Sequence, residues 1–210
     1  MVLPVKDAGM NPTRFVFVIV AGCCLLCSEP LPAQEAPFDW GKPFSADMVM
    51  TTAKGLNFTQ KMYGDGGKMR TEVSMNGRQM VTIVRPDLQK LYQVSVDQKM
   101  VVETTYDPSK SKSPMAAASG PHGKFELIGP DMAEGAACMK YKVTSNASNK
   151  VSFMWVDAAT KAPVKMVAED GSFTMLWKNY KAGPQDPALF EVPAGYKVMS
   201  MQSTPGGAGQ

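Results

Sequence analysis

The sequence predicts a mainly β protein built from antiparallel hairpins. Apolar and polar residues alternate with period two over short runs, most regularly in Lys68–Met75, and this alternation is typical of strands with one buried face. Pro, Gly and Asp-Gly or Asn-Gly pairs end the runs, and Asn76-Gly77 is a strong signal for a tight hairpin turn. A long helical pattern is not evident, so the turns are expected to join strand to strand.

Six strands are expected before residue 107. In the first of them Met48 and Met50 share a face, because alternate side chains of a strand point the same way. Turn residues such as Gly64-Asp-Gly-Gly67 separate each strand from the next. The expected strands are Phe44–Thr51, Leu56–Tyr63, Lys68–Met75, Gln79–Val84, Gln89–Val96 and Lys99–Tyr106.

The strand pattern stops between Asp107 and Gly123. This segment opens with a polar, proline-bounded stretch, and Met115–Ala118 has room for at most one helical turn, so we predict a mobile loop or lid. The run Phe190–Tyr196 is assigned to the same antiparallel meander as the strands, and residues 203–210 to a disordered tail. The later expected strands are Lys124–Ile128, Ala137–Thr144, Val151–Val156, Val164–Ala168 and Phe173–Trp177.

The N-terminus indicates export. Phe15–Leu26 is an apolar run too short to cross a bilayer, preceded by Arg14, and this pattern is typical of a secretory signal. We predict a signal peptide over residues 1–33, with Met10 as a candidate true start, and a mature domain over 34–202 in the periplasm or outside the cell. The alternative is a membrane-anchored lipoprotein acylated at Cys23.

Composition argues against nucleic acid and against catalysis. The net charge is +3 with both signs interspersed, which is too mild for a nucleic-acid surface. Cys138 is the only cysteine after the leader and is expected to be a small buried side chain; His122, the only histidine, is expected in an exposed turn. Nucleophile, phosphate-loop and zinc-ligand motifs are lacking, so no enzyme activity, catalytic residue, metal or cofactor is predicted.

Several segments together carry a resemblance to a known family. Lys68–Glu72, Gly135–Tyr141, Trp155–Asp157 with Pro163–Lys165, and Phe190–Tyr196 resemble an uncharacterised family of bacterial exported proteins that is similar to the periplasmic LolA-like carriers, which sort outer-membrane lipoproteins. The resemblance spans about Phe44–Met201. It implies a curved antiparallel half-barrel sheet whose concave apolar face takes acyl chains under a cover of helices or loops.

A methionine-rich sheet face is the candidate binding surface. All but two of the 17 methionines follow the leader, and flexible thioether side chains suit irregular apolar ligands. Ordinary core packing is the alternative role, and Cu(I) binding by Met-x-Met pairs is disfavoured because no His or Cys accompanies them. The expected ligand-binding residues are Met48, Met50, Phe58, Met69, Val73, Met80, Tyr141, Trp155 and Met166.

These observations favour an exported, non-enzymatic protein that binds a lipid or an acylated protein partner. The alternative is a structural or interaction module of the cell envelope, which would have a filled core and would dock another envelope protein.

Overall fold

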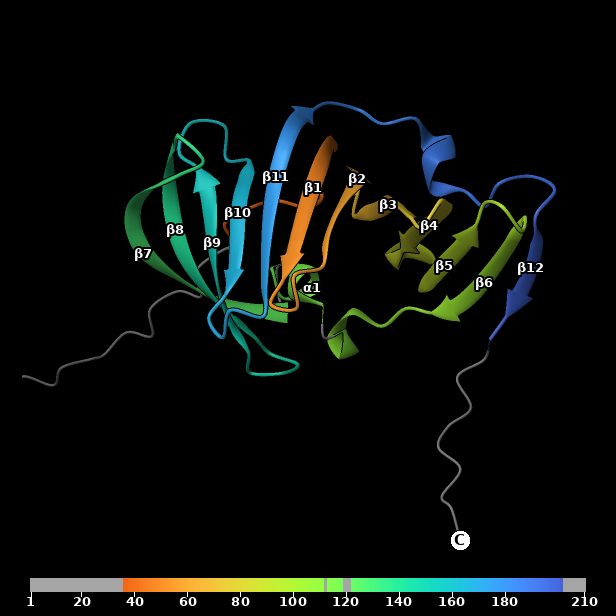
Figure 1. Ribbon diagram of the computed structural model, residues 1–210, viewed down its shortest axis with the longest axis horizontal. Coiled ribbons are helices and arrows are strands. Elements are labelled where there is room, and N and C mark those ends of the chain that lie inside the picture. The colour runs from red at the N-terminus through yellow and green to blue at the C-terminus, as the bar shows by residue number, and fades with distance from the viewer. Residues whose placement is uncertain (1–35, 112, 119–121, 202–210) are drawn as a thin grey trace, which may run out of the picture. The chain divides into compact units, whose positions relative to one another are not determined.

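Twelve strands lie side by side in one sheet in the computed structural model, within the part of the chain that the structure describes (Figure 1). The described residues are 36–111, 113–118 and 122–201, and all fall in the unit Ala33–Gln210. The leader predicted over residues 1–33 and the tail predicted over 203–210 lie outside them. The sheet order is β12-β6-β5-β4-β3-β2-β1-β11-β10-β9-β8-β7. The predicted mainly β, curved antiparallel class is therefore confirmed.

Each expected strand is present, with bounds that differ from the prediction by a few residues. β7 and β11 are longer than predicted, because alternation continues through Gly129 on one and past Trp177 on the other. The strands are β1 Phe44–Thr52, β2 Asn57–Asp65, β3 Lys68–Met75, β4 Arg78–Arg85, β5 Lys90–Ser95, β6 Met100–Thr105, β7 Gly123–Ala133, β8 Ala136–Ser145, β9 Val151–Asp157, β10 Pro163–Ala168, β11 Phe173–Ala182 and β12 Lys197–Ser200.

Turn chemistry explains why the hairpins form where they do. Asn76 and Gly77 join β3 to β4 with φ angles of 52° and 75°, a left-handed pair that suits the twist of a two-residue hairpin. Consecutive strands then pair antiparallel in register, for example Met69 with Val84 and Val73 with Met80. The alternation that is read from the sequence thus becomes a division of side chains between two sheet faces.

The segment after β11 corrects the predicted meander. Phe190–Tyr196 is not a strand. It follows a short helix, η4 (Pro187–Phe190), whose first turn is capped by the side chain of Asp186, which accepts a hydrogen bond from the Ala188 amide. The chain then crosses the sheet and adds β12 parallel to β6. Pro at the start of η4 and Asp186 before it favour a helical turn over an extended strand.

We call the two sheet faces the lid face and the strap face. The lid segment, residues 106–122, lies against the lid face and contains η2 (Pro108–Lys110) and α1 (Pro114–Ala117). The short helix predicted near Met115–Ala118 is thus confirmed, whereas the predicted mobility of the segment stays a prediction. The strap, residues 183–196, lies against the opposite face over β3 to β6. A further 3-10 turn, η1 (Pro86–Leu88), joins β4 to β5.

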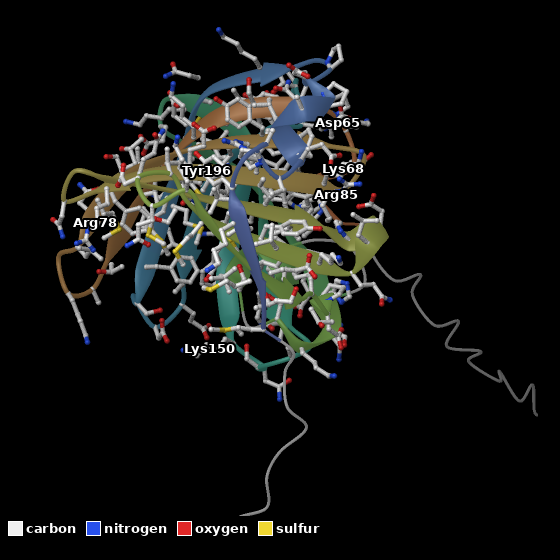
Figure 2. All side chains as sticks on the ribbon, turned by 90° about the vertical axis from the view of Figure 1, so that its right-hand side faces the viewer. Asp65, Lys68, Arg78, Arg85, Lys150 and Tyr196 are labelled. Atoms are coloured by element: carbon white, nitrogen blue, oxygen red, sulfur yellow. The ribbon has the colours of Figure 1, made fainter. Side chains whose placement is uncertain are left out.

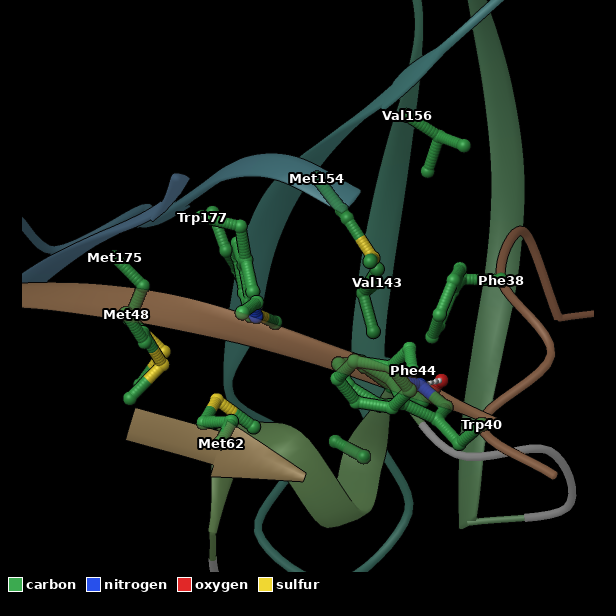
Figure 3. Packing of buried hydrophobic residues seen from close by; sticks show 14 of the residues in the cluster. Phe38, Trp40, Phe44, Met48, Met62, Val143, Met154, Val156, Met175 and Trp177 are labelled. Atoms are coloured by element: carbon green, nitrogen blue, oxygen red, sulfur yellow. Dashed lines mark hydrogen bonds between the residues drawn. The ribbon is translucent and has the colours of Figure 1, made fainter. Parts of the chain in front are cut away.

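Most of the lid face of β1, β2 and β8–β11 is filled by the protein's own side chains. Phe38, Trp40 and Phe44 meet edge to face, with ring centroids 4.6 to 5.8 Å apart, above a row of buried methionines (Figure 3). Ala117 and Ala118 bring α1 into the same cluster. The buried members of this core are Phe38, Trp40, Phe44, Ala46, Met48, Met62, Ala117, Ala118, Phe125, Val143, Met154, Val156, Met166, Met175 and Trp177.

Two arginines hold the strap against the other face. Arg85 lies at the end of β4 opposite Arg78 (Figure 2) and is 8% exposed. Its guanidinium donates to Asp87, to the Glu191 carboxylate at 2.6 Å and to the Phe190 carbonyl at 3.3 Å. Arg70 donates to the Leu189 carbonyl at 3.0 Å. Phe190 consequently packs into a small core with Ile83 and Val101.

Candidate functional site

A cavity of about 470 Å³ lies between the lid face of the central strands and the lid segment. Its sheet side comes from alternating positions of β2 to β5, which the register places next to one another. Met62 pairs with Thr71 and Thr71 with Thr82, while Met69 pairs with Val84 in the adjacent row. The sheet residues that line it are Gln60, Met62, Met69, Thr71, Thr82, Val84 and Leu91.

The roof of the cavity comes from the lid segment and from the chain before β1. Tyr106 and Pro108 enter at the end of β6, and Ser111, Ser113 and Met115 continue the lining toward α1. The remaining lining residues are Trp40, Gly41, Gly67, Pro86, Ala116 and His122. The cavity is therefore assembled from segments that are far apart in the sequence.

Hydrogen bonds at the roof position the lid. The indole Nε1 of Trp40 donates to the Ala118 carbonyl at 2.9 Å, which ties the segment before β1 to the end of α1. Within the lid, the Ser113 hydroxyl accepts from the Met115 amide at 3.3 Å. Gly123 then allows close approach, because a Cβ there would lie 2.1 Å from the carbonyl oxygen of Ala117.

The lining combines an apolar floor with neutral polar groups. Burial raises the pKa of the Tyr106 hydroxyl, which therefore stays a protonated donor at neutral pH. Gln60 directs its amide to the sulfur of Met48 at 3.9 Å, at the border between the cavity and the filled core. A site of this composition can hold an apolar ligand and offer it a few neutral hydrogen-bonding groups.

Eight of the nine residues predicted to bind a ligand point to the lid face. The register pairs Met48 with Gln60, Met50 with Phe58 and Val73 with Met80, so the single face predicted for the residues of β1 to β4 is present. Tyr141 and Met166 both pair with Met154 on that same face.

These eight residues nevertheless occupy three environments. Met69 lines the cavity. Met48 and Met166 are fully buried in the filled core, with Met50 and Tyr141 packed against it. Phe58 and Val73 are half-buried and Met80 is 46% exposed, beyond the cavity toward the β3–β4 turn.

Trp155 is the exception, and its placement on the binding face is corrected. It projects to the strap-face side of β9, where its indole Nε1 donates to Asp131 at 2.9 Å. The ammonium groups of Lys140 and Lys165 lie 4.7 and 5.5 Å from its ring. Met154 and Val156, its neighbours in sequence, enter the lid-face core instead, since successive side chains of a strand alternate.

Several cavity residues were not predicted from the sequence. Met62 and Thr82 continue the predicted alternation, so that pattern could have found them. His122 was expected in an exposed turn, but it is half-buried and lines the cavity, because the lid folds back over the sheet. Tyr106 likewise lines the cavity from the end of its strand.

Other site types have little support in residues 36–111, 113–118 and 122–201. Groups of three or more His, Cys, Asp or Glu that could hold a metal ion are not found among them. Cys138 is free and buried as predicted, and burial raises the pKa of its thiol. Of the helices in these residues, none has the length and apolar character needed to span a membrane.

The fold and cavity define a class of β protein with one curved sheet and a lidded apolar pocket. Residues 44–161 match the family model described as a domain of unknown function, DUF4412, and the chain belongs to that family. Curated proteins offer no match to this sequence.

Solved structures show the same fold at low sequence identity. An uncharacterized conserved protein from Thermus thermophilus is 14% identical, over 77% of this chain and 91% of that chain, with a TM-score of 0.56. A putative outer membrane lipoprotein-sorting protein domain from Vibrio parahaemolyticus is 12% identical over 73% and 92%, with a TM-score of 0.38. A LolA superfamily protein from Nitrosomonas europaea is 6% identical over 77% and 91%, with a TM-score of 0.35.

The resemblance predicted from the sequence, to an uncharacterised family similar to the LolA-like proteins, is thus confirmed. At these identities the likeness concerns the fold alone.

Proposed function

We propose that this protein binds the acyl chain of a lipid or of an acylated protein in the cavity under the lid segment. The observation that carries the proposal is the unequal filling of one apolar sheet face. Beside β1 and β8–β11 the face is packed by aromatic rings and alanines, whereas over β2–β5 it bounds a cavity of about 470 Å³. This volume lies within the range of small-molecule sites.

The floor of the cavity supports an apolar occupant. Met62, Met69, Val84 and Leu91 supply aliphatic and thioether surface, and flexible methionine side chains adapt to chains of different shape. The same face continues past Val73 to the exposed Met80, so a long chain has apolar surface to follow beyond the cavity.

The cell envelope is the proposed place of action, with no catalytic step. The short apolar run Phe15–Leu26 supports export, followed by a periplasmic or secreted life or by anchoring at Cys23. N-terminal sequencing of exported protein should find Gln34 or a residue close to it. An acylated Cys23 would replace the free form by the membrane-anchored one.

A second candidate function is docking of an envelope protein. Edge strand β7 favours it, because Ile128 and Met132 are 54% and 63% exposed there, and exposed edges with apolar side chains suit strand addition or protein contact. In this alternative the cavity would have no lipid occupant.

Blocking the cavity separates the two functions. Thr82→Trp should fill the space over β4 and abolish uptake of a fluorescent acyl probe. Met80→Trp is the matched control, since Met80 lies on the same strand and face but outside the lining. It should leave uptake within about twofold of the wild type. Circular dichroism must show both variants folded. Equal uptake by Thr82→Trp and wild type would contradict acyl binding at this site.

A further inference from the structure

The cavity lining has a uniform electrostatic character. Among the described residues that line it, none is Asp, Glu, Lys or Arg, and His122 is the one imidazole. The polar members are neutral hydroxyl and amide groups: Gln60, Thr71, Thr82, Tyr106, Ser111 and Ser113. A ligand in the cavity therefore meets hydrogen-bonding partners but no fixed ionic partner.

The charges of the lining strands are directed elsewhere. In β3, Met69 and Thr71 face the cavity, while Arg70 and Glu72 project to the strap face and form an ion pair of 2.6 Å. Arg85 at the end of β4 is likewise engaged with Asp87 and Glu191. Strand alternation keeps these cations out of reach of a ligand on the lid face.

Neutral groups remain available inside the cavity. In the described part of the chain, no side-chain hydrogen bond engages the hydroxyls of Thr71, Thr82 or Tyr106. A hydroxyl can donate to and accept from an ester, an amide or an alcohol. It cannot replace a cation for a buried carboxylate or phosphate, whose charge is costly to remove from water without one.

We propose that the cavity selects acyl ligands whose polar group is uncharged, such as esters, amides and alcohols, over free fatty-acid carboxylates and anionic phosphate lipids. This inference rests on the proposed function and specifies the ligand class of the same site.

Ligands that share one acyl chain test the selection. The wild-type protein is loaded with the fluorescent acyl probe, and displacement by 1-monooleoylglycerol, oleate and oleoyl lysophosphatidylglycerol is compared. We expect the glyceride to displace the probe at concentrations about tenfold or more below those of the two anions. Equal or better displacement by oleate would overturn the selection and leave acyl binding intact. Failure of the probe itself to bind would remove both proposals.

An added cation should change the preference. Thr82→Lys places an ammonium in the lining, and oleate should then gain about tenfold in affinity relative to the glyceride. Met80→Lys adds the same charge on the same strand face outside the lining and should not shift the preference. His122→Gln should also keep the wild-type order, and a reversal there would assign the selection to the imidazole and overturn the account. A shift in Met80→Lys equal to that in Thr82→Lys would do the same.

Discussion

The indole nitrogen of Trp40 donates a 2.9 Å hydrogen bond to the carbonyl oxygen of Ala118, 78 residues further along the chain. The bond joins the segment before β1 to the end of the lid helix, and both residues are buried. It fixes the roof of the cavity to the filled core.

Trp40→Phe should therefore loosen the lid while keeping most of the aromatic packing. Loss of the donor leaves a buried carbonyl without that partner, at a cost of about 1 to 3 kcal/mol in unfolding free energy. Limited proteolysis should cut within residues 106–122 faster than in the wild type, and a bound acyl ligand should slow the cleavage. Identical cleavage rates in the variant and the wild type would separate the Trp40 bond from the lid.

Gly123→Ala tests the other end of the lid. The added Cβ would lie 2.1 Å from the Ala117 carbonyl oxygen, so α1 or β7 must shift. We expect a loss of about 1 to 3 kcal/mol in stability from overpacking and faster release of an acyl probe. Lys124→Ala, at the next and exposed position, is the control and should be close to neutral. A Gly123→Ala protein with wild-type stability and release would contradict the close approach.

Arg85 should make strap stability depend on pH. Arg85 donates hydrogen bonds to Asp87 and lowers the pKa of that carboxyl. Because the folded pKa lies below the unfolded one, the contribution is present above the unfolded value and is lost as pH falls through the folded value. Arg85→Met should cost about 2 kcal/mol at pH 7, since it leaves the Glu191 and Phe190 acceptors without their donor.

Urea unfolding at pH 7 and in the acid range measures this dependence. The difference between wild type and Arg85→Met should shrink as the pH falls below about 4, where carboxylates protonate. Lys90→Met removes the more exposed ion pair with Glu103 and should cost less than about 1 kcal/mol. A constant difference across the pH range would show that the Asp87 pair does not contribute.

Met69→Gln compares the cavity with the core. Met69 lines the cavity and is half-buried, so a glutamine amide there can reach water or the neutral lining groups. Uptake of an acyl probe should fall about tenfold or more, while the melting temperature drops by a few degrees. Met166→Gln, at a fully buried position, should cost several kcal/mol because it adds an unpaired amide to a filled core. Similar destabilisation by both substitutions would indicate that the space around Met69 is packed.

The local part of the fold was predictable from the sequence because it depends on alternation and turns. β3 has the predicted bounds, Lys68–Met75, since its periodicity is regular and Asn76-Gly77 ends it. β12 was not predicted, because Lys197–Ser200 are all exposed and only their distance along the strap places them beside β6. Parallel pairing of this kind depends on contacts far apart in the chain.

The candidate site was predictable only as a face. Met69 and Met166 occupy equivalent alternating positions, yet one lines the cavity and the other is completely buried. Their difference arises from where α1 and Trp40 cover the sheet, which single-strand patterns do not encode. Trp155 shows the same limit, because three consecutive buried residues in β9 serve both sheet faces.

Analysis of lipids that accompany the protein tests acyl binding most directly. Wild type and Thr82→Trp would be purified from the cell envelope under identical conditions, extracted with organic solvent, and compared by mass spectrometry. Acyl lipids in stoichiometric amount with the wild type, and their loss from a folded Thr82→Trp protein, are the predicted result. Wild-type protein that carries no acyl lipid and takes up none when it is offered would contradict the account and favour the docking function.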